Sequence, residues 1–584
     1  MSAIDILNDF EEIWFFDFEY SNERGETVQP ICLVARELKS DKLLRIWEDE
    51  LQTMKQPPYN TGSESLFIAY YAPAEISCHL ALYWPVPDYI VDLYAEFRTI
   101  TNGTYLPHGR GLLGAMSYFG LCGIDTIEKT EMRDLALRGG PWTGQEKSSL
   151  LDYCHTDVEA LYSLFPLMLP KIKDIRQSIL RGMYMACIGE MEFVGIPIDI
   201  DYFISLQEYW DDIRDELIKE VDKNYGVFDG HTFKQDLFTH YLASNCIEWP
   251  RLPSGSLDLK DETFKQQSKA YPQLSELREL RGTLSKMKLN KLSIGKSGRN
   301  RCMLSPFSSI TGRNQPSTSK FVFGPSTWIR GLIKPSEGMG IAYIDWSQQE
   351  FGIAAALSGD KLMQEAYSSG DPYLAFAIQA KAVPENATKH SHKLERSLFK
   401  ECVLAVQYGM GEEALANRIN QSVAKARELL TLHKETYRTF WRWSDAALDS
   451  TMLSGSIMTV FGWQFHVANN NANPRSIRNF PMQANGSEML RLACIMIRNE
   501  GITVCCPVHD AVLIEAPLDK LDTHIATVQK LMEEASSIVL DGFKLKSDVD
   551  VVRHPNRYMD ERGEAIWRKI YKLLNKHSSN VWDH

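Results

Sequence analysis

Two apolar runs that each meet an aspartate constrain this chain more than any other feature of its sequence. The first, "IAYIDWSQQE", reads as a buried strand that ends at Asp345. The second, "ITVCCPVHDAVLIEAP", reads as two strands with His509 and Asp510 at the turn between them. A carboxylate at the end of a buried strand is unfavourable unless it is paired or binds a cation. The two segments therefore predict a fold in which distant strands supply acids to one site.

Such a pair of acids is what a two-metal phosphoryl-transfer site requires, because Mg²⁺ prefers carboxylate oxygens as ligands. The sequence has no Gly-rich phosphate-binding loop, so side chains must hold the phosphates. The segment "RSLFKECVLAVQYGMG" places Arg396 and Lys400 on one helical face, and Leu404 and Tyr408 continue that face. Taken alone, this cation pair is better explained by a solvent-facing amphipathic helix.

Length and composition exclude several classes of protein. A chain of 584 residues is long for one core, so two or more domains are expected. No apolar run approaches the ~20 residues of a membrane span, and the acidic N-terminus does not resemble a signal peptide. The eleven cysteines are scattered without a Cys-x-x-Cys pair, which favours reduced, buried thiols. We therefore expect a cytoplasmic protein, in the host cytoplasm if the chain is viral.

The distribution of charge is uneven. The net charge of −13 argues weakly against a non-specific nucleic-acid binder. Residues 278–301, however, contain eight Lys or Arg and one acid, and the second half of this segment is rich in Gly and Ser. A flexible segment that follows a phosphate backbone has this composition, but taken alone the segment is better explained by a solvated helix face with a basic loop.

The order of the predicted elements suggests two regions. Strand-like runs and a helix-like segment at 148–169 alternate in the first ~165 residues, which indicates an α/β domain. Residues from about 176 to 300, and again from 355 to 450, show mostly helical spacing of apolar residues.

Together these elements resemble DNA polymerase family A, of the compact phage kind, with an N-terminal DEDDy-type 3′–5′ exonuclease. "DWSQQE" is similar to the first palm motif of the family, "RSLFKECVLAVQYG" to its fingers motif, and "VHDAVLIE" to its last palm motif. "RSIRNFPMQANGS" and "TGRNQPS" fit two further elements that contact primer and template. The resemblance covers almost the whole chain.

The resemblance implies a role for each matching residue. Asp345 and Asp510 would bind two Mg²⁺ ions, for which Mn²⁺ can substitute, and Glu350 would exclude the 2′-OH of a ribonucleotide. The other expected nucleotide-binding residues are Arg396, Lys400, Leu404, Tyr408 and Tyr373. The expected DNA-binding residues are Arg313, Arg475, Asn479, Gln483 and His509, with Lys286, Lys288 and Lys291 in the basic segment.

Three positions depart from the family pattern. Position 511 is Ala where the family commonly has Glu, so a third palm carboxylate is missing from the motif. Position 404 is Leu where Phe or Tyr is common, and position 373 is Tyr where His is frequent. Asp345 and Asp510 would then have to hold the metals alone, which is chemically sufficient.

The N-terminal acids follow their own pattern. "FFDFEY" places Asp17 and Glu19 on one side of a strand, and "YCHTDVEA" places Tyr153 and Asp157 on one helical face. By resemblance these acids would bind two Mg²⁺ ions while Tyr153 orients the attacking water. Glu75 is the best match for the fourth carboxylate, and Asp92 is a rival for that position.

The expected architecture is a ribonuclease H-like α/β exonuclease domain followed by a right-hand polymerase. Residues 1–175 would form the exonuclease and 176–584 the polymerase, with a helical thumb at about 200–300, an α+β palm at about 301–355 and 479–584, and helical fingers at about 356–478. The resemblance implies a monomeric enzyme that extends primed DNA with dNTPs, proofreads, replicates a phage genome and works with a helicase and a single-strand binding protein.

Three alternatives remain. The exonuclease domain could be inactive, or the chain could be a single-subunit RNA polymerase, although Glu350 would exclude the ribose that such an enzyme must accept. A non-catalytic DNA-binding scaffold is disfavoured because all five expected polymerase-site residues are present: Asp345, Arg396, Lys400, Tyr408 and Asp510.

Overall fold

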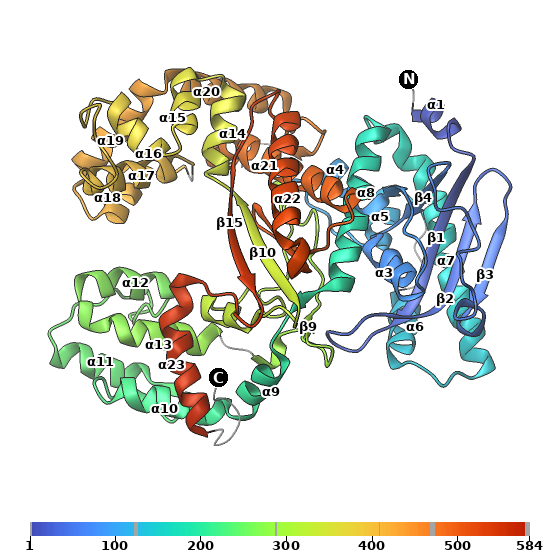
Figure 1. The fold of residues 1–584 in the computed structure, drawn as a ribbon, viewed down its shortest axis with the longest axis horizontal. Helices are drawn as coiled ribbons and strands as arrows, with labels where there is room; N and C mark the ends of the chain where they lie inside the picture. Colours follow the sequence, from blue (N-terminus) through green and yellow to red (C-terminus); the bar gives the residue numbers. More distant parts are fainter. Residues whose placement is uncertain (1–2, 122–125, 287–288, 408, 468–472, 578–584) are drawn as a thin grey trace.

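The computed structural model describes residues 3–121, 126–286, 289–407, 409–467 and 473–577 (Figure 1). In the view of Figure 1 an N-terminal α/β unit lies on the right and a small sheet lies near the centre. Two groups of helices lie at the upper and lower left, toward the two ends of the strands of that central sheet. Within the described ranges, no helix combines the length and the apolarity needed to cross a membrane.

The N-terminal unit is built on a five-stranded mixed sheet in the order β3-β2-β1-β4-β5. Its strands are β1 (Glu12–Ser21), β2 (Gln29–Glu37), β3 (Leu43–Trp47), β4 (Ser65–Ala69) and β5 (Tyr89–Asp92). Phe15 and Phe16 on β1 belong to different hydrophobic cores, because successive strand side chains point to opposite faces. Both faces of the sheet are covered, which explains the continuous apolar run around these residues.

Helices supply the two covers of this sheet. α7 (Gly144–Met168) packs against β1 and β2 and shares the core of Phe15, whereas α3 (Pro73–Ala81) shares the core of Phe16. The other helices are α1 (Ala3–Asn8), α2 (Glu48–Leu51), α4 (Leu93–Thr101), α5 (Leu112–Tyr118), α6 (Thr126–Arg138), the 3₁₀ turn η1 (Leu169–Lys171) and α8 (Ile175–Val194). A capping box of Thr143 and Glu146 begins α7. The predicted helix at 148–169 is confirmed.

The central sheet has four strands in the order β13-β14-β10-β15. They are β13 (Val504–Val508), β14 (Ala511–Pro517), β10 (Met339–Trp346) and β15 (Ser547–Arg553), and each pairs antiparallel with its neighbour. The long helices α21 (Pro474–Asn499) and α22 (Leu518–Val539) pack against each other, and α22 packs against β10. The strand predictions around residues 345 and 510 are confirmed.

The upper helical group begins directly after β10. Its helices are α14 (Gln349–Ser358), α15 (Lys361–Ser368), α16 (Pro372–Gln379), α17 (Lys393–Gln407), α18 (Glu412–Ile419), α19 (Val423–Thr436) and α20 (Arg438–Ser454). A hairpin of β11 (Ser456–Met458) and β12 (Gln464–His466) follows and contacts α4 of the N-terminal unit. The prediction of helix over most of 355–450 is confirmed.

The lower helical group has a small aromatic core of its own, around Phe238 and Phe264. Its elements are α9 (Ile200–Glu208), α10 (Trp210–Asp222), β7 (Phe228–Asp229), β8 (Thr232–Phe233), α11 (Gln235–Ser244), α12 (Asp261–Ala270), η2 (Pro272–Leu274), α13 (Ser275–Lys286) and η3 (Leu289–Lys291). Short segments β6 (Ile196–Pro197), β9 (Arg299–Asn300) and η4 (Thr327–Leu332) connect it to the rest of the chain.

The last helix, α23 (Glu561–His577), lies with this lower group (Figure 1). The domain boundaries expected from the sequence had placed these residues in the palm. Trp567 packs on Tyr202, with ring centroids 4.9 Å apart. Lys576 pairs with Glu216 on α10 at 2.8 Å. The apolar face of α23 therefore finds its partner in a segment about 360 residues earlier, which local sequence does not reveal.

A buried ion pair lies where the N-terminal unit meets the rest of the chain. Arg181 on α8 donates to both carboxylate oxygens of Glu96 on α4, at 2.6 and 2.9 Å. The third guanidinium nitrogen donates to the carbonyl of Phe461, in the loop of the β11–β12 hairpin, at 3.0 Å. Arg98 of α4 also donates to the carbonyl of Phe307 at 2.8 Å. Charge-assisted hydrogen bonds thus fix one unit against the other.

Candidate active sites

The fold brings Asp345 and Asp510 together at one edge of the central sheet. Asp345 stands opposite Ala511 in the β10–β14 pairing, so Asp510 is at the turn directly beside it. The two carboxyl groups are within hydrogen-bonding reach of each other. Burial, followed by the charge of Asp510, raises the pKa of Asp345 to about 7. Burial also raises the pKa of Asp510, while the nearby Arg313 opposes that shift.

This pair of acids fits a divalent cation. Asp345 Oδ1 is buried and has no hydrogen-bond partner among the described residues. The charges that act most strongly on Asp345 are those of other carboxylates, so the site carries concentrated negative charge. Hard carboxylate oxygens with this geometry are suitable ligands for Mg²⁺. The donor set therefore matches the metal that the sequence predicts.

Glu350 lies in the first turn of α14 and forms an ion pair with Arg313. Its Oε1 lies 3.2 Å from Nη2 of Arg313, and the Gln483 amide is also within hydrogen-bonding reach. Burial raises the pKa of Glu350, and the guanidinium of Arg313 opposes that shift. The structure thus joins three predicted site residues from three different segments.

The loop that carries Arg313 is anchored by residues that the sequence analysis missed. Arg491 on α21 donates to the carbonyl of Gly312 at 2.9 Å, and Gly312 has a φ of +73°, which favours glycine. Arg491 is itself paired with Glu488, and both side chains are almost fully buried. Thr459 donates to the same carboxylate at 2.6 Å. The paired positions at 488 and 491 are the one local signal that could have revealed this anchor.

Arg396 and Lys400 both approach Tyr373. The guanidinium carbon of Arg396 lies 5.6 Å from the Tyr373 ring centroid, and Lys400 Nζ lies 5.8 Å from it. Arg396 Nε also donates to Asp371 at 2.5 Å, so Asp371 orients this cation. The predicted nucleotide-binding residues of α16 and α17 therefore converge. Leu404 is half-buried further along α17, and Tyr408 lies outside the described residues.

The expected DNA-binding residues are more scattered. Arg475, Asn479 and Gln483 follow one another along α21, which begins where Asn473 accepts a hydrogen bond from the Arg475 amide. His509 is exposed at the β13–β14 turn, with a left-handed φ of +59°. Lys291 is exposed on η3. The side chain of Lys286 and all of Lys288 lie outside the described residues.

Three arginines of the basic segment are engaged inside the protein, which the composition did not predict. The guanidinium carbon of Arg281 lies 4.4 and 3.9 Å from the ring centroids of Phe233 and Phe264. Arg299 pairs with Glu515 at 2.5 Å, and Arg301 donates to the carbonyl of Phe193 at 2.6 Å. These three side chains stabilise the fold, so fewer cations of residues 278–301 face solvent than the sequence suggested.

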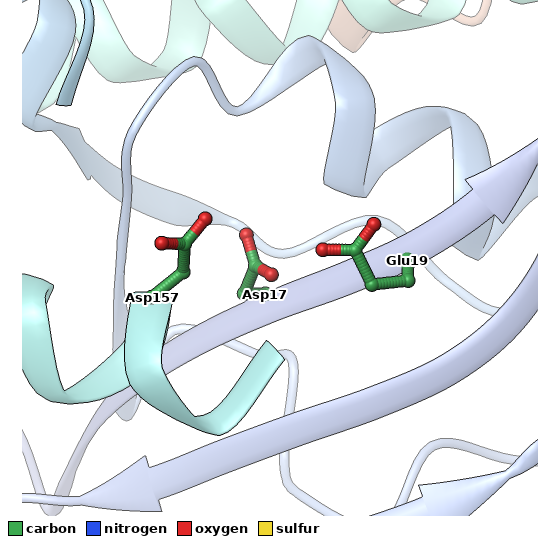
Figure 2. Close-up of side chains that lie close together, drawn as sticks. All are labelled: Asp17, Glu19 and Asp157. Carbon is green, nitrogen blue, oxygen red and sulfur yellow. The ribbon is translucent and has the colours of Figure 1, made fainter. Parts of the chain in front are cut away.

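A second acidic cluster lies in the N-terminal unit. Asp17 and Glu19 on β1 and Asp157 on α7 point toward one another (Figure 2), and one carboxylate oxygen from each lies within 4.8 Å of the others. Burial and the charge of Asp157 raise the pKa of Asp17 to about 8, and burial with the charge of Asp17 raises the pKa of Glu19. Tyr153 shares the face of α7 that carries Asp157. Three such carboxylates can hold a divalent cation.

The structure separates the two candidates for the fourth carboxylate. Glu75 is buried on α3, and burial followed by the charge of Asp17 raises its pKa. Its Oε2 accepts a hydrogen bond from the Phe18 amide at 2.9 Å. Asp92 instead caps α4, accepting from the Ala95 and Ala72 amides at 2.8 and 2.7 Å. Glu75 is therefore close enough to feel the charge of Asp17, although it is not one of the three acids whose oxygens lie within 4.8 Å of one another, whereas the oxygens of Asp92 accept backbone hydrogen bonds.

Lys129 and an adjoining cavity lie beside the acidic cluster, and no sequence pattern predicted either of them. Lys129 Nζ lies 2.9 Å from Asp157 Oδ2 and 5.6 Å from the centroid of the Tyr153 ring. A cavity of about 410 Å³ opens beside the cluster. Its lining includes side chains of the N-terminal unit and of residues 303–308: Asp17, Tyr70, Tyr71, Tyr94, Arg110, Lys129, Asp157, Met303, Ser305 and Ser308. No spacing in the sequence links these residues.

The chain is similar in sequence to known proteins. A sequence model of DNA polymerase family A matches residues 261–554. DNA polymerase I of Aquifex aeolicus is 24% identical over 432 residues, which cover 67% of this chain and 73% of that protein. The DNA polymerase of Mycobacterium phage L5 is 24% identical over 389 residues, covering 64% and 62%. For DNA polymerase I of Deinococcus radiodurans, 28% identical over 233 residues, the match spans 38% of this chain and only 24% of that protein.

A solved structure of a polymerase domain has a similar fold. The POL domain of Pol1 from M. smegmatis, in complex with DNA primer-template and dNTP, superposes with a TM-score of 0.72 at 16% identity. The match covers 94% of this chain and 97% of that one. The expected polymerase fold is thereby confirmed, and the family match, which spans half of the chain, contains both Asp345 and Asp510. The chain belongs to DNA polymerase family A.

Proposed function

We propose that this family A chain extends the 3′ end of a DNA primer with dNTPs paired to a template strand. The observation that carries the proposal is the convergence of Asp345 and Asp510 from segments 165 residues apart. Bound there, two Mg²⁺ ions would assist the attack of the primer 3′-OH and stabilise the departing pyrophosphate. Catalysis would rest on positioning and on the neutralisation of charge.

The side chains of the chain have separate tasks in this proposal. Arg396 and Lys400 bind the triphosphate, and Tyr373 and Asp371 keep these cations in place. Glu350, held by Arg313, fills the space that a ribose 2′-OH would need. The expected primer–template contacts of Arg475, Asn479, Gln483 and His509 remain part of the same proposal.

The N-terminal unit would be a proofreading 3′–5′ exonuclease. Asp17, Glu19 and Asp157 would bind divalent cations, with Glu75 as the fourth carboxylate. Tyr153 would orient the attacking water. The cavity beside the cluster is lined by Tyr70, Tyr71, Tyr94 and Arg110, which suit an unpaired 3′ end because aromatic rings stack on bases and arginine binds phosphate. These features support an active rather than an inactive domain.

The proposed biological setting is the replication of a phage genome by a monomeric enzyme, with a helicase and a single-strand binding protein as partners. The likeness to the polymerase of Mycobacterium phage L5 supports this setting.

Two variants test the two activities separately. Asp345→Ala should abolish primer extension and leave degradation of a mismatched 3′ end, whereas Asp17→Ala should do the reverse. Extension should prefer dNTPs to rNTPs. Nucleotide incorporation by Asp345→Ala at the wild-type rate would overturn the polymerase mechanism, and a preference for rNTPs would favour an RNA polymerase. Degradation by Asp17→Ala at the wild-type rate would overturn the exonuclease assignment.

A further inference from the structure

Three residues on neighbouring strands of the central sheet form one row. Asp345 on β10 stands opposite Ala511 on β14 and, on its other side, opposite Asp548 on β15. Directly opposed residues of antiparallel strands point to the same face, with Cβ atoms about 4.5–5.5 Å apart. Position 511 has no carboxylate, so the row carries its second acid on the edge strand β15 instead.

Asp548 is oriented within this row by a hydrogen bond. Ser347, two residues after Asp345, donates from its hydroxyl to Asp548 Oδ2 at 2.6 Å. The charge of Asp548 acts on Asp345 more strongly than any charge except that of Asp510. Strand register therefore places the exposed Asp548 on one side of Asp345 and the β13–β14 turn with Asp510 on the other. The buried oxygen Asp345 Oδ1 between these two elements has no partner among the described residues.

Asp550 provides an internal comparison. It also lies on β15 and faces the same side, but it stands opposite Tyr343, one step further from the Asp345 end of the strand. Its charge acts on Asp345 more weakly than that of Asp548. Asp548 therefore differs from Asp550 because of its position on the strand, directly opposite Asp345, and not because of its charge.

We propose that Asp548 is a third metal-binding carboxylate of the palm site, on the opposite side of Asp345 from the Glu that the family motif carries at position 511. The proposal rests on the proposed two-metal polymerase function. Its physical reason is that a sheet can place a ligand beside Asp345 from either neighbouring strand, because both neighbours present a directly opposed side chain. An additional carboxylate would raise the affinity of the site for a divalent cation.

The test is a Mn²⁺ titration of the 584-residue chain, in which electron paramagnetic resonance measures the free Mn²⁺. All variants carry Asp17→Ala, so that the N-terminal cluster contributes less to the binding measured. Asp548→Asn, which preserves shape, should weaken binding at the remaining site about tenfold. Asp550→Asn removes the same charge from the same strand and should change the affinity less than twofold. Adding Ala511→Glu to Asp548→Asn should restore most of the lost affinity.

Two results would overturn the proposal: unchanged Mn²⁺ affinity in Asp548→Asn, or an equal loss in Asp550→Asn. The melting temperature in EDTA, which should match that of the parent, shows that a loss of affinity does not come from unfolding. Asp345→Ala tests the underlying polymerase site by itself. If that variant keeps full Mn²⁺ affinity, the two-metal function fails; if it loses affinity while Asp548→Asn does not, only the role of Asp548 fails.

Discussion

The ammonium nitrogen of Lys129 lies 2.9 Å from Oδ2 of Asp157, inside the carboxylate cluster of the N-terminal unit. Both side chains are largely shielded from solvent, and the same ammonium lies near the face of Tyr153. The lysine therefore neutralises an oxygen that a divalent cation would also use. A cation that binds the cluster must displace this ammonium or share the carboxylate with it.

Removing the charge of Lys129 should strengthen metal binding at the N-terminal cluster. In an Asp345→Ala background, Lys129→Met should bind Mn²⁺ about fivefold more tightly, which corresponds to about 1 kcal/mol for a partly exposed ion pair. Lys147→Met is the matched control, because Lys147 lies over the Trp47 ring instead. Calorimetric titration measures the affinity. Weaker binding in Lys129→Met would mean that the ammonium supports the metal site and does not compete with it.

The raised carboxyl pKa values predict how stability depends on pH. Burial, with a neighbouring carboxylate, raises the pKa of Asp17 to about 8 and that of Asp345 to about 7. Between the unfolded value of about 4 and these values, the folded protein holds protons that the unfolded chain has released. The free energy of unfolding should therefore fall as pH rises through this window.

In EDTA, the melting temperature should decrease from about pH 5 to about pH 8, and Mg²⁺ should raise it more at pH 8 than at pH 5. Differential scanning calorimetry measures both effects. The double variant Asp17→Asn/Asp345→Asn is the control and should flatten the decrease. A slope that is unchanged in this variant would assign the pH dependence to other groups.

Glu350→Ala should open the nucleotide site to ribonucleotides. The carboxylate is held by Arg313 at 3.2 Å, so its removal leaves space where a 2′-OH would otherwise be excluded. The preference for dNTPs over rNTPs, measured as a ratio of kcat/KM values, should fall by about 10–200-fold. Glu413→Ala on the exposed surface of α18 is the control. An unchanged ratio would remove Glu350 from the discrimination of sugars.

Gln349→Met should stabilise the protein. Gln349 is buried, and among the described residues neither its amide nitrogen nor its amide oxygen has a hydrogen-bond partner. Because an unsatisfied buried amide is unfavourable, the substitution should raise the free energy of unfolding by about 1 kcal/mol or more. Gln364→Met is the control, since Gln364 donates to the Ala355 carbonyl and should give no gain. Denaturant unfolding decides between gain and loss.

Glu96→Ala should destabilise the junction between the N-terminal unit and the rest of the chain. It would leave the guanidinium of Arg181 buried without its carboxylate partner, at a cost of about 3–5 kcal/mol. Glu564→Ala breaks the exposed pair with Arg568 and should cost less than about 1 kcal/mol. Denaturant unfolding monitored by tryptophan fluorescence compares the two. The double variant Glu96→Ala/Arg181→Met should be less destabilised than Glu96→Ala alone.

Local patterns in the sequence predicted a large part of both sites. Alternation along a strand placed Asp17 and Glu19 on one face, and a four-residue helical step placed Tyr153 with Asp157. The strand ends at 345 and 510, the helix of Arg396 and Lys400, and the element types around them were also predicted correctly. Each of these features is set by residues fewer than ten positions apart.

Residues joined by long-range pairing could not be predicted in this way. Lys129 meets Asp157 only because α6 and α7 pack on the same sheet, and α23 finds α10 across almost the whole polymerase region. The exposure of the basic segment was mispredicted for the same reason. Whether an arginine faces solvent or contacts aromatic rings, as Arg281 does, depends on neighbours that are distant in sequence.

The sequence alone determined which acids lie on or next to strands and which cations share a helical face, because backbone periodicity fixes the direction of nearby side chains. Tertiary structure decided which acids meet. Strand order and register place Asp548 beside Asp345, and they leave Asp92 to cap a helix while Glu75 lies with Asp17. Those choices depend on how the cores pack and which strands pair, and no short stretch of sequence contains that information.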